Sequence, residues 1–476
     1  MSSLKEATNS AEKIKELLET GRFEEAEKAL AELSGSEDPL LRILSAEVSL
    51  YFSRFEPVPQ LLAAIDPFSL DARTYSRFLL VQGDYALSQL DLDQARQRYE
   101  AAYFNYRLFG DRYEKASGLL RLGRMSFVQG KVEEAATLLT EAEGLIKNGE
   151  TPRSEFLLGL VQMSLGACRL SLGQTEAAKE LLDSALLLLQ ETERCRYYAA
   201  TLTLEGELLA AAGRYTEAVE FLNEAHILLT RYSISDELAR ASSRLAATLV
   251  RLGRYDEAHR VLLDSLEVHE RMEDTRGAAQ ILYALADFHL ERNEIPKAEK
   301  IAAEALAQAA KARDDLLQAA IHIVAGRAAA RRRDTAAAEK ELLAALQIAE
   351  TYGEKRLEGM SCLYLAEAYY GSSPVKAQEY VARASELLQT LHDPYLDQEL
   401  QRIAQRSTSE RIKLTPDNKL IFDGNFLPNW YSAKEALEQF LLKNALKQAG
   451  GNLTKAGEIL GITKVHVHNL RKQFGI

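Results

Sequence analysis

The chain has 476 residues, of which 47% are hydrophobic and 27% are charged, so it has the material for a large buried core. Its net charge of −12 excludes a protein that nucleic acid coats along its whole length. Only 10 residues are proline, while alanine, leucine and glutamate are abundant, which favours helices over strands.

The three cysteines are Cys168, Cys195 and Cys362, and their wide spacing matches neither a metal site nor a disulfide framework. We therefore expect small core residues in a reduced, cytoplasmic protein. The N-terminal residues are charged and lack the apolar stretch of a signal peptide. The longest notable uncharged run, residues 156–168, is too short to span a bilayer, so we expect no membrane contact.

A unit of about forty residues repeats along the chain as far as residue 406. Its clearest copies read Gly-Arg-aromatic-x-Glu-Ala and begin at Gly21, Gly213 and Gly253. The last residue of this motif, the turn alanine, recurs at intervals of forty between Ala178 and Ala338. Its positions, one of which holds valine, are Ala26, Val58, Ala95, Ala135, Ala178, Ala218, Ala258, Ala298, Ala338 and Ala377.

A second small residue precedes most turn alanines by twelve positions, at Ala46, Gly83, Gly123, Gly166, Gly206, Ala246, Ala286 and Gly326. Each unit therefore reads as a helix, a short turn and a second helix. The small residues let the two backbones approach, and we expect the aromatic residue after the turn to fill the space beside them. One pair cannot bury its own apolar face, so about ten pairs should stack into an all-α solenoid.

This pattern resembles tetratricopeptide repeats in the forty-residue form of bacterial signalling regulators and kinesin light chains. The resemblance implies a solenoid over residues 1–406 whose first helices line a concave wall. Counting back from the turn alanines predicts these wall positions: Arg124, Glu207, Arg240, Tyr283, Asp287, Arg327 and Tyr370. We interpret the wall as a groove for a peptide, a protein segment or a small ligand. The alternative is an ordinary solvated helix surface.

Residues 407–431 interrupt the helical pattern. Arg411 to Leu414 alternates like a strand, a turn sequence follows, and Leu420 to Phe422 reads as a second strand. We therefore expect a linker with a short β-hairpin. Ser432 and Glu435 then form a capping box that opens a helix to about Ala449.

The end of the chain predicts two capped helices around a tight turn. Asn452 can cap the first helix, Gly461 can adopt the left-handed conformation that ends it, and Thr463 can cap the second. Val467 and Leu470 would then face inward together with Phe474. This layout is typical of a DNA-binding helix-turn-helix, and the alternative is a small solvated helical hairpin.

Charge supports a DNA-binding end. Residues 432–476 hold seven Lys or Arg and three Glu, a net charge of +4, which leaves −16 for the rest of the chain. The predicted DNA-binding residues are Asn452, Thr454, Lys455, Thr463, Lys464, Val465, His466, His468, Asn469, Arg471 and Lys472. Outward residues at the start of such a helix can enter a major groove while basic residues meet phosphate.

The sequence GNLTKAGEILGIT…LRKQFGI resembles the Fis-type helix-turn-helix of bacterial transcriptional regulators. By this resemblance, Thr463, Lys464, His466, His468 and Asn469 fall on base- and phosphate-contacting positions of the family. The resemblance also implies that the preceding helix mediates dimerisation. The alternative role for its apolar stripe is support of the two terminal helices. The stripe consists of Ala436, Leu437, Phe440, Leu441, Ala445 and Leu446.

The chain shows no catalytic or metal-binding constellation, and residues 123–131 fail the spacing of a phosphate loop. We therefore expect no enzyme activity and no cofactor. The best interpretation is a bacterial transcriptional regulator that binds double-stranded DNA, as a homodimer whose two recognition helices meet successive major grooves, and a peptide or protein partner in the groove. The alternative is an interaction scaffold whose helix-turn-helix docks protein instead of DNA.

Overall fold

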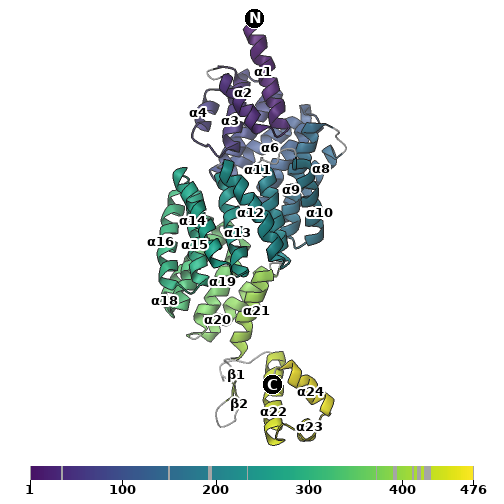
Figure 1. Ribbon diagram of the computed structural model, residues 1–476, viewed down its shortest axis with the longest axis vertical. Coiled ribbons are helices and arrows are strands. Elements are labelled where there is room, and N and C mark those ends of the chain that lie inside the picture. Colours follow the sequence, from purple (N-terminus) through teal and green to yellow (C-terminus); the bar gives the residue numbers. More distant parts are fainter. Residues whose placement is uncertain are drawn as a thin grey trace. The chain divides into compact units, whose positions relative to one another are not determined.

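The computed structural model describes residues 2–33, 36–147, 151–190, 196–232, 234–370, 372–389, 394–409, 412–414, 420–422 and 430–474. It divides into two compact units, and Figure 1 shows their helices and strands coloured along the sequence. The first contains residues 1–361 and 387–394, and the second contains residues 362–386 and 395–476. None of the described helices combines the length and the apolar character that a bilayer crossing requires.

Ten helical pairs follow one another through the described ranges up to residue 388, as the repeat predicts. In chain order the pairs are α1 (Ser2–Glu19) with α2 (Phe23–Glu32), α3 (Pro39–Tyr51) with α4 (Val58–Ala63), α5 (Ala72–Ser88) with α6 (Leu92–Phe109), α7 (Arg112–Val128) with α8 (Val132–Ile146), α9 (Pro152–Ser171) with α10 (Thr175–Leu189), α11 (Arg196–Ala211) with α12 (Tyr215–Tyr232), α13 (Ser235–Arg251) with α14 (Tyr255–Arg271), α15 (Thr275–Glu291) with α16 (Ile295–Lys311), α17 (Asp315–Arg331) with α18 (Thr335–Tyr352), and α19 (Lys355–Tyr369) with α20 (Pro374–Leu388). A short 3₁₀ turn, η1 (Pro67–Ser69), follows α4. Every predicted turn position lies in the first turn of a second helix and is at most 1% exposed.

The small residues allow close helix packing, but leucine rather than the turn aromatic fills the adjoining space. A Cβ atom added to Gly206 would lie 2.5 Å from Cγ of Leu222, and Leu222 is fully buried. Gly326 has the same relationship with Leu342. Tyr255, by contrast, is 42% exposed, so the expectation for the aromatic was wrong in that repeat. An aliphatic side chain one turn after the turn alanine points directly at the facing backbone.

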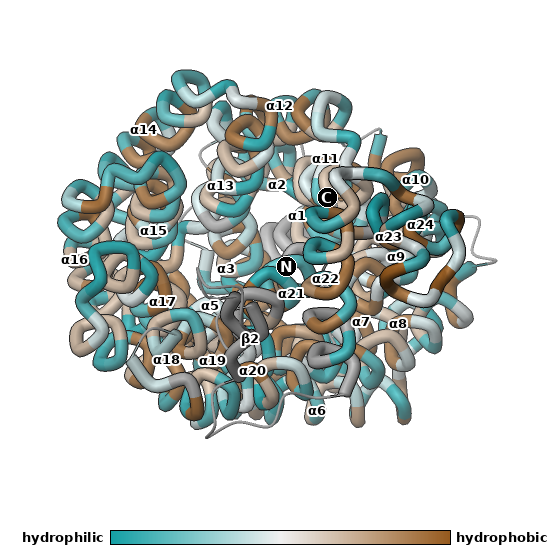
Figure 2. The backbone as a smooth tube through the Cα atoms, turned by 90° about the horizontal axis from the view of Figure 1, so that it is seen from below, coloured by the Kyte–Doolittle hydropathy of each residue, from teal (hydrophilic) through white to brown (hydrophobic). Residues whose placement is uncertain are grey.

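First helices line the inner side of the first unit. Each odd-numbered helix from α7 to α15 packs against the next odd-numbered helix as well as against its own partner. In Figure 2, α14 and α16 lie outside α13 and α15. Closer approach between first helices than between second helices is what gives a stack of helical pairs a concave side.

The N-terminal pairs also contact helices that lie far away in sequence. The rings of Phe23 and Tyr51 stack with their centroids 3.6 Å apart. Phe156 of α9 and Tyr197 of α11 lie about 6 Å from this stack, in tilted or edge-on orientations. The aromatic cluster joins α2 and α3 to α9 and α11, and the forty-residue period of the sequence does not predict this contact.

The second unit contains the end of α19, most of α20, and α21 (Pro394–Ser409). Strands β1 (Ile412–Leu414) and β2 (Leu420–Phe422) pair antiparallel, with Lys413 opposite Ile421. The predicted turn between them lies outside the described residues. Because α21 extends to Ser409, the linker expected from residue 407 begins later than predicted.

Three further helices follow: α22 (Trp430–Gln448), α23 (Leu453–Leu460) and α24 (Lys464–Gln473). The prediction that Ser432 caps the first of these was wrong, because α22 begins two residues earlier. Leu442, Ala445, Ala456 and Val467 form the buried centre of this bundle. The predicted stripe on α22 is divided: Ala445 and Leu446 pack on α23 and α24, while Leu437 and Leu441 are exposed.

Candidate functional site

The predicted wall residues Glu207 and Arg240 form an ion pair on the inner side of the solenoid. Arg240 of α13 donates from Nε and Nη2 to the Glu207 carboxylate of α11, at 3.0 and 3.1 Å. Arg244, one turn further along α13, donates to the same carboxylate at 3.0 Å. Burial by itself would raise the pKa of Glu207, but the two guanidinium groups lower it to about 2. Glu207 is therefore ionised and committed to its two partners.

A second charged group of wall residues lies on α15 and α17. Arg327 contacts Asp287 at 2.6 Å and Glu291 at 2.8 Å. Tyr283 lies one turn before Asp287 on α15, and the charges of Asp287, Arg327 and Arg244 act on the pKa of its hydroxyl. Burial is the main cause that raises the pKa of Tyr283.

Five of the seven predicted wall residues therefore lie in two ion-paired groups and their neighbourhood: Glu207 with Arg240, and Asp287 with Arg327, with Tyr283 one turn before Asp287. The other two lie elsewhere. Arg124 is half-buried on α7, where its charge acts on Tyr99. Tyr370 directly follows α19 in the second unit.

The ion pairs follow a rule that sequence reasoning missed. An acidic residue directly after the small residue of a first helix pairs with an arginine of the next first helix. The pairs are Glu47 with Arg77 at 2.9 Å, Asp84 with Arg121 at 3.1 Å, Glu207 with Arg240 at 3.0 Å, Asp287 with Arg327 at 2.6 Å and, in the second unit, Glu367 with Arg402 at 2.9 Å. The signal was present in the sequence as acidic residues at a fixed place in the repeat.

A cavity of about 110 Å³ lies between α1, α5, α7 and α9, and sequence reasoning did not identify it. Its apolar lining includes Phe23, Leu157, Leu160 and Tyr197. Its polar lining includes Arg77, which donates to Glu47 at 2.9 Å and to Glu19 at 3.0 Å. Tyr106 and Tyr113 line the same space, and burial raises the pKa of both hydroxyls.

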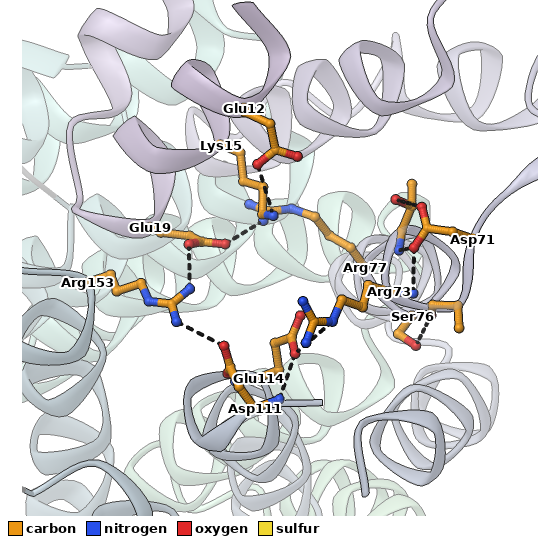
Figure 3. A network of polar contacts seen from close by, with 12 residues as sticks. Glu12, Lys15, Glu19, Asp71, Arg73, Ser76, Arg77, Asp111, Glu114 and Arg153 are labelled. Carbon is orange, nitrogen blue, oxygen red and sulfur yellow. Dashed lines mark hydrogen bonds and ion pairs between the residues drawn. The ribbon is translucent and has the colours of Figure 1, made fainter. Parts of the chain in front are cut away.

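Charges of alternating sign surround this region (Figure 3). Arg153 of α9 contacts Glu19 at 3.5 Å and Asp111 at 2.9 Å. Glu114 accepts a hydrogen bond from the Asp111 backbone N–H and lies 3.6 Å from Nε of Arg73. Arg73 is the most exposed of these groups, with 61% of its side chain accessible. In this network of charges, Arg77 therefore donates two hydrogen bonds to carboxylates, whereas Arg73 makes only the 3.6 Å contact with Glu114.

The three C-terminal helices form a second candidate site. The predicted caps are confirmed: Asn452 Oδ1 accepts from the backbone N–H groups of Thr454 and Lys455, and Thr463 Oγ1 accepts from that of His466. Gly461 has a φ of +67° and ends α23, as predicted. The close packing at Gly457 was not predicted: a Cβ atom there would lie 2.7 Å from the carbonyl oxygen of Ile462.

The packing of α24 agrees with the predicted orientation. Val467 is fully buried, and Leu470 and Phe474 pack against the same core. All the predicted DNA-binding residues are exposed, with Val465 at 69%. Exposed residues on the first two turns of α24 are therefore available to a partner.

Other chemistry is limited in the described ranges. No group of three or more His, Cys, Asp or Glu side chains there is placed to hold a metal ion. Cys168 and Cys362 are buried thiols, and burial raises the pKa of Cys168 to about 12. Cys195 lies outside the described residues.

Two stretches match models of the tetratricopeptide repeat, residues 80–151 and residues 237–311. The solenoid contains tetratricopeptide repeats. No curated protein matches the chain in sequence.

Solved structures share the solenoid fold. A Rap protein complexed with competence and sporulation factor has a TM-score of 0.52 at 14% identity, over 84% of this chain and 99% of the Rap chain. The apo form of the quorum sensor NprR from B. thuringiensis has a TM-score of 0.50 at 14% identity, over 73% of this chain and 97% of its own. At this level of identity the likeness concerns the fold alone.

Proposed function

We propose that this protein is a DNA-binding transcriptional regulator whose tetratricopeptide solenoid receives a peptide or protein partner and controls a C-terminal helix-turn-helix of the Fis type. The observation that carries the proposal is the division of α24 into two faces. Val467 and Leu470 pack inward, while Lys464, His468 and Asn469 are exposed. A short helix with a packed apolar side and an exposed polar N-terminal half suits insertion into a major groove.

The residues at the two ends of α24 support DNA binding. Thr463 satisfies one backbone N–H and leaves the positive end of the helix exposed beside Lys464. Arg471 and Lys472 are exposed in the last turn and can contact phosphate from the other end of the helix. Residues 432–476 carry a net charge of +4, so binding should depend strongly on salt.

The inner face of the solenoid supports partner binding. Its helices present carboxylates and guanidinium groups, and Tyr283 lies on the same helix as Asp287. These groups pair with one another, but Arg244 and Glu291 keep 55% and 42% of their side chains exposed, so they can still contact the charged side chains of an extended segment. A solenoid of similar fold was solved in complex with competence and sporulation factor, which fits a role in receiving a signal.

A gel-shift titration tests the DNA-binding part. Full-length protein with Lys464→Ala and His468→Ala should bind a pool of genomic duplex DNA at least about tenfold more weakly than wild type, because it loses one phosphate and one base-edge contact. Lys434→Ala is the matched control, since Lys434 is exposed on α22 beside Glu438. It should change affinity by less than about twofold.

Two outcomes would contradict the proposal. Equal affinity in wild type and the double variant would remove α24 from the DNA contact. Absence of salt-dependent DNA binding by the wild type would favour the scaffold alternative, for which the exposed Val465 and Ile459 would be the docking residues.

A further inference from the structure

The cavity between α1, α5, α7 and α9 has the properties of a small-molecule site. Its volume of about 110 Å³ is well above the roughly 10–15 Å³ that one water molecule needs, so it has room for a small organic molecule. One part of its lining is apolar, including Phe23, Leu157 and Leu160, and another part is charged. A ligand that fills it must therefore combine a small aliphatic group with a charged end.

The charges that line the cavity are balanced. Its lining contains four carboxylates and four cations: Glu12, Glu19, Glu47 and Glu114 with Lys15, Arg73, Arg77 and Arg121. A lining without net charge offers no general attraction to an anion or to a cation. A molecule that carries both signs a few ångströms apart can pair with both kinds of group at once.

The arginines of the cavity differ in how many hydrogen bonds they already donate to protein groups. Arg77 donates hydrogen bonds to two carboxylates, and Arg121 donates to Asp84 and to Ser117. These two guanidinium groups already donate hydrogen bonds to protein side chains, so few of their N–H groups remain for a ligand. Arg73 differs, because its guanidinium donates no hydrogen bond to any described residue and lies 3.6 Å from Glu114.

Two hydroxyl groups complete the polar lining. Tyr106 and Tyr113 both line the cavity, and no described residue hydrogen-bonds to either hydroxyl. Both hydroxyls are therefore available to hydrogen-bond to a molecule in the cavity. Water could serve one of them, but the apolar part of the lining would gain nothing from water.

We propose that this cavity binds a free α-amino acid with a small aliphatic side chain. Arg73 pairs with the α-carboxylate, Glu114 accepts hydrogen bonds from the α-ammonium group, and the side chain lies against Leu157 and Leu160. Valine, with eight non-hydrogen atoms, is of the expected size. The site connects α1 with α5, α7 and α9, so its occupation would stabilise the closed N-terminal part of the solenoid. The proposal does not depend on DNA binding.

Calorimetric titration of the full-length protein with valine tests the proposal. Two analogues of the same shape are the controls: isobutylamine lacks the carboxylate, and 3-methylbutanoate lacks the ammonium group. Valine should bind and raise the melting temperature, and each analogue should bind at least tenfold more weakly. No heat and no thermal shift with valine, alanine or leucine at about 10 mM, where even a weak site is saturated, would overturn the proposal.

Variants locate the site. Arg73→Met keeps the aliphatic stem and removes the charge, and Glu114→Gln keeps an acceptor for the backbone N–H of Asp111, the N-cap residue of α7. Both should weaken valine binding at least tenfold with little change in the melting temperature of the free protein. Arg96→Met is the matched control, since Arg96 is an exposed arginine of α6 paired with Glu100, and it should bind valine like wild type. Unchanged binding in both cavity variants, or equal binding of the analogues, would overturn the assignment.

Discussion

The backbone N–H of Arg196 donates a 2.8 Å hydrogen bond to the hydroxyl of Tyr51, a residue 145 positions earlier in the chain. The guanidinium of Arg196 donates to the backbone carbonyls of Leu50 and Tyr51, at 3.3 and 2.8 Å. These bonds join the end of α3 to the start of α11. They bring the N-terminal helical pairs into contact with α11, which lies several repeats later in the sequence.

Replacing Tyr51 with Phe tests the weight of this contact. The ring should keep its stack on Phe23, but the buried N–H of Arg196 loses its acceptor, so we expect a loss of about 1–3 kcal/mol in the free energy of unfolding. Urea denaturation measures it. Tyr103→Phe is the control, because the Tyr103 hydroxyl makes only a 3.4 Å contact with Glu141 at the surface, and its effect should stay within about 0.5 kcal/mol. Equal effects would mean that the hydrogen bond from Arg196 to the Tyr51 hydroxyl stabilises the protein no more than a surface contact does.

Substitutions of Gly206 and Gly144 distinguish the effect of helix packing on stability from that of helix propensity. Gly206→Ala places a Cβ 2.5 Å from Leu222 and should destabilise the protein by about 1–3 kcal/mol. Gly144 lies exposed in α8 with no atom within 4 Å of an added Cβ, so Gly144→Ala should stabilise by about 0.5–1 kcal/mol. Thermal denaturation of both variants gives the comparison. Two changes of the same sign would contradict the packing account.

The low pKa of Glu207 predicts a dependence of stability on acid. Its pKa of about 2 lies below the ordinary value of 4.5, so its contribution is complete above pH 4.5 and is lost as the pH falls from there towards 2. The full contribution is on the order of 3 kcal/mol at 1.36 kcal/mol per pKa unit. The difference in unfolding free energy between wild type and Glu207→Gln, measured in urea, should therefore shrink between pH 5 and pH 3. A constant difference over this range would show that the ion pairs with Arg240 and Arg244 do not hold the carboxylate ionised.

Replacing Gly457 and replacing Gly461 should destabilise the C-terminal helices by different amounts. Gly457→Ala brings a Cβ to 2.7 Å from the Ile462 carbonyl oxygen, so α23 and α24 must separate, at a cost of about 1–3 kcal/mol. Gly461→Ala meets no atom within 4 Å and pays only for its left-handed backbone, about 1 kcal/mol. Hydrogen exchange of the α24 amides should accelerate more in Gly457→Ala than in Gly461→Ala. The reverse order would show that backbone strain outweighs the contact.

Local features of the chain could be predicted because they depend on neighbouring residues. The turn alanines, the caps at Asn452 and Thr463 and the left-handed Gly461 each depend on a few residues within one or two helical turns. Their geometry is therefore written in a short stretch of sequence. The start of α22 escaped prediction because several residues near Trp430 can begin a helix, and Ser432 is only one of them.

The order and pairing of the helices in the repeats follow from the sequence alone, since the forty-residue period repeats one local helical pair. The tertiary structure decided which of those pairs meet around the cavity. Glu19, Arg77 and Arg153 come from α1, α5 and α9, and the contacts of the N-terminal pairs with α9 and α11 bring them together. Small rotations between successive pairs add up over several repeats, so contacts across such distances depend on the accumulated twist, which no single repeat contains.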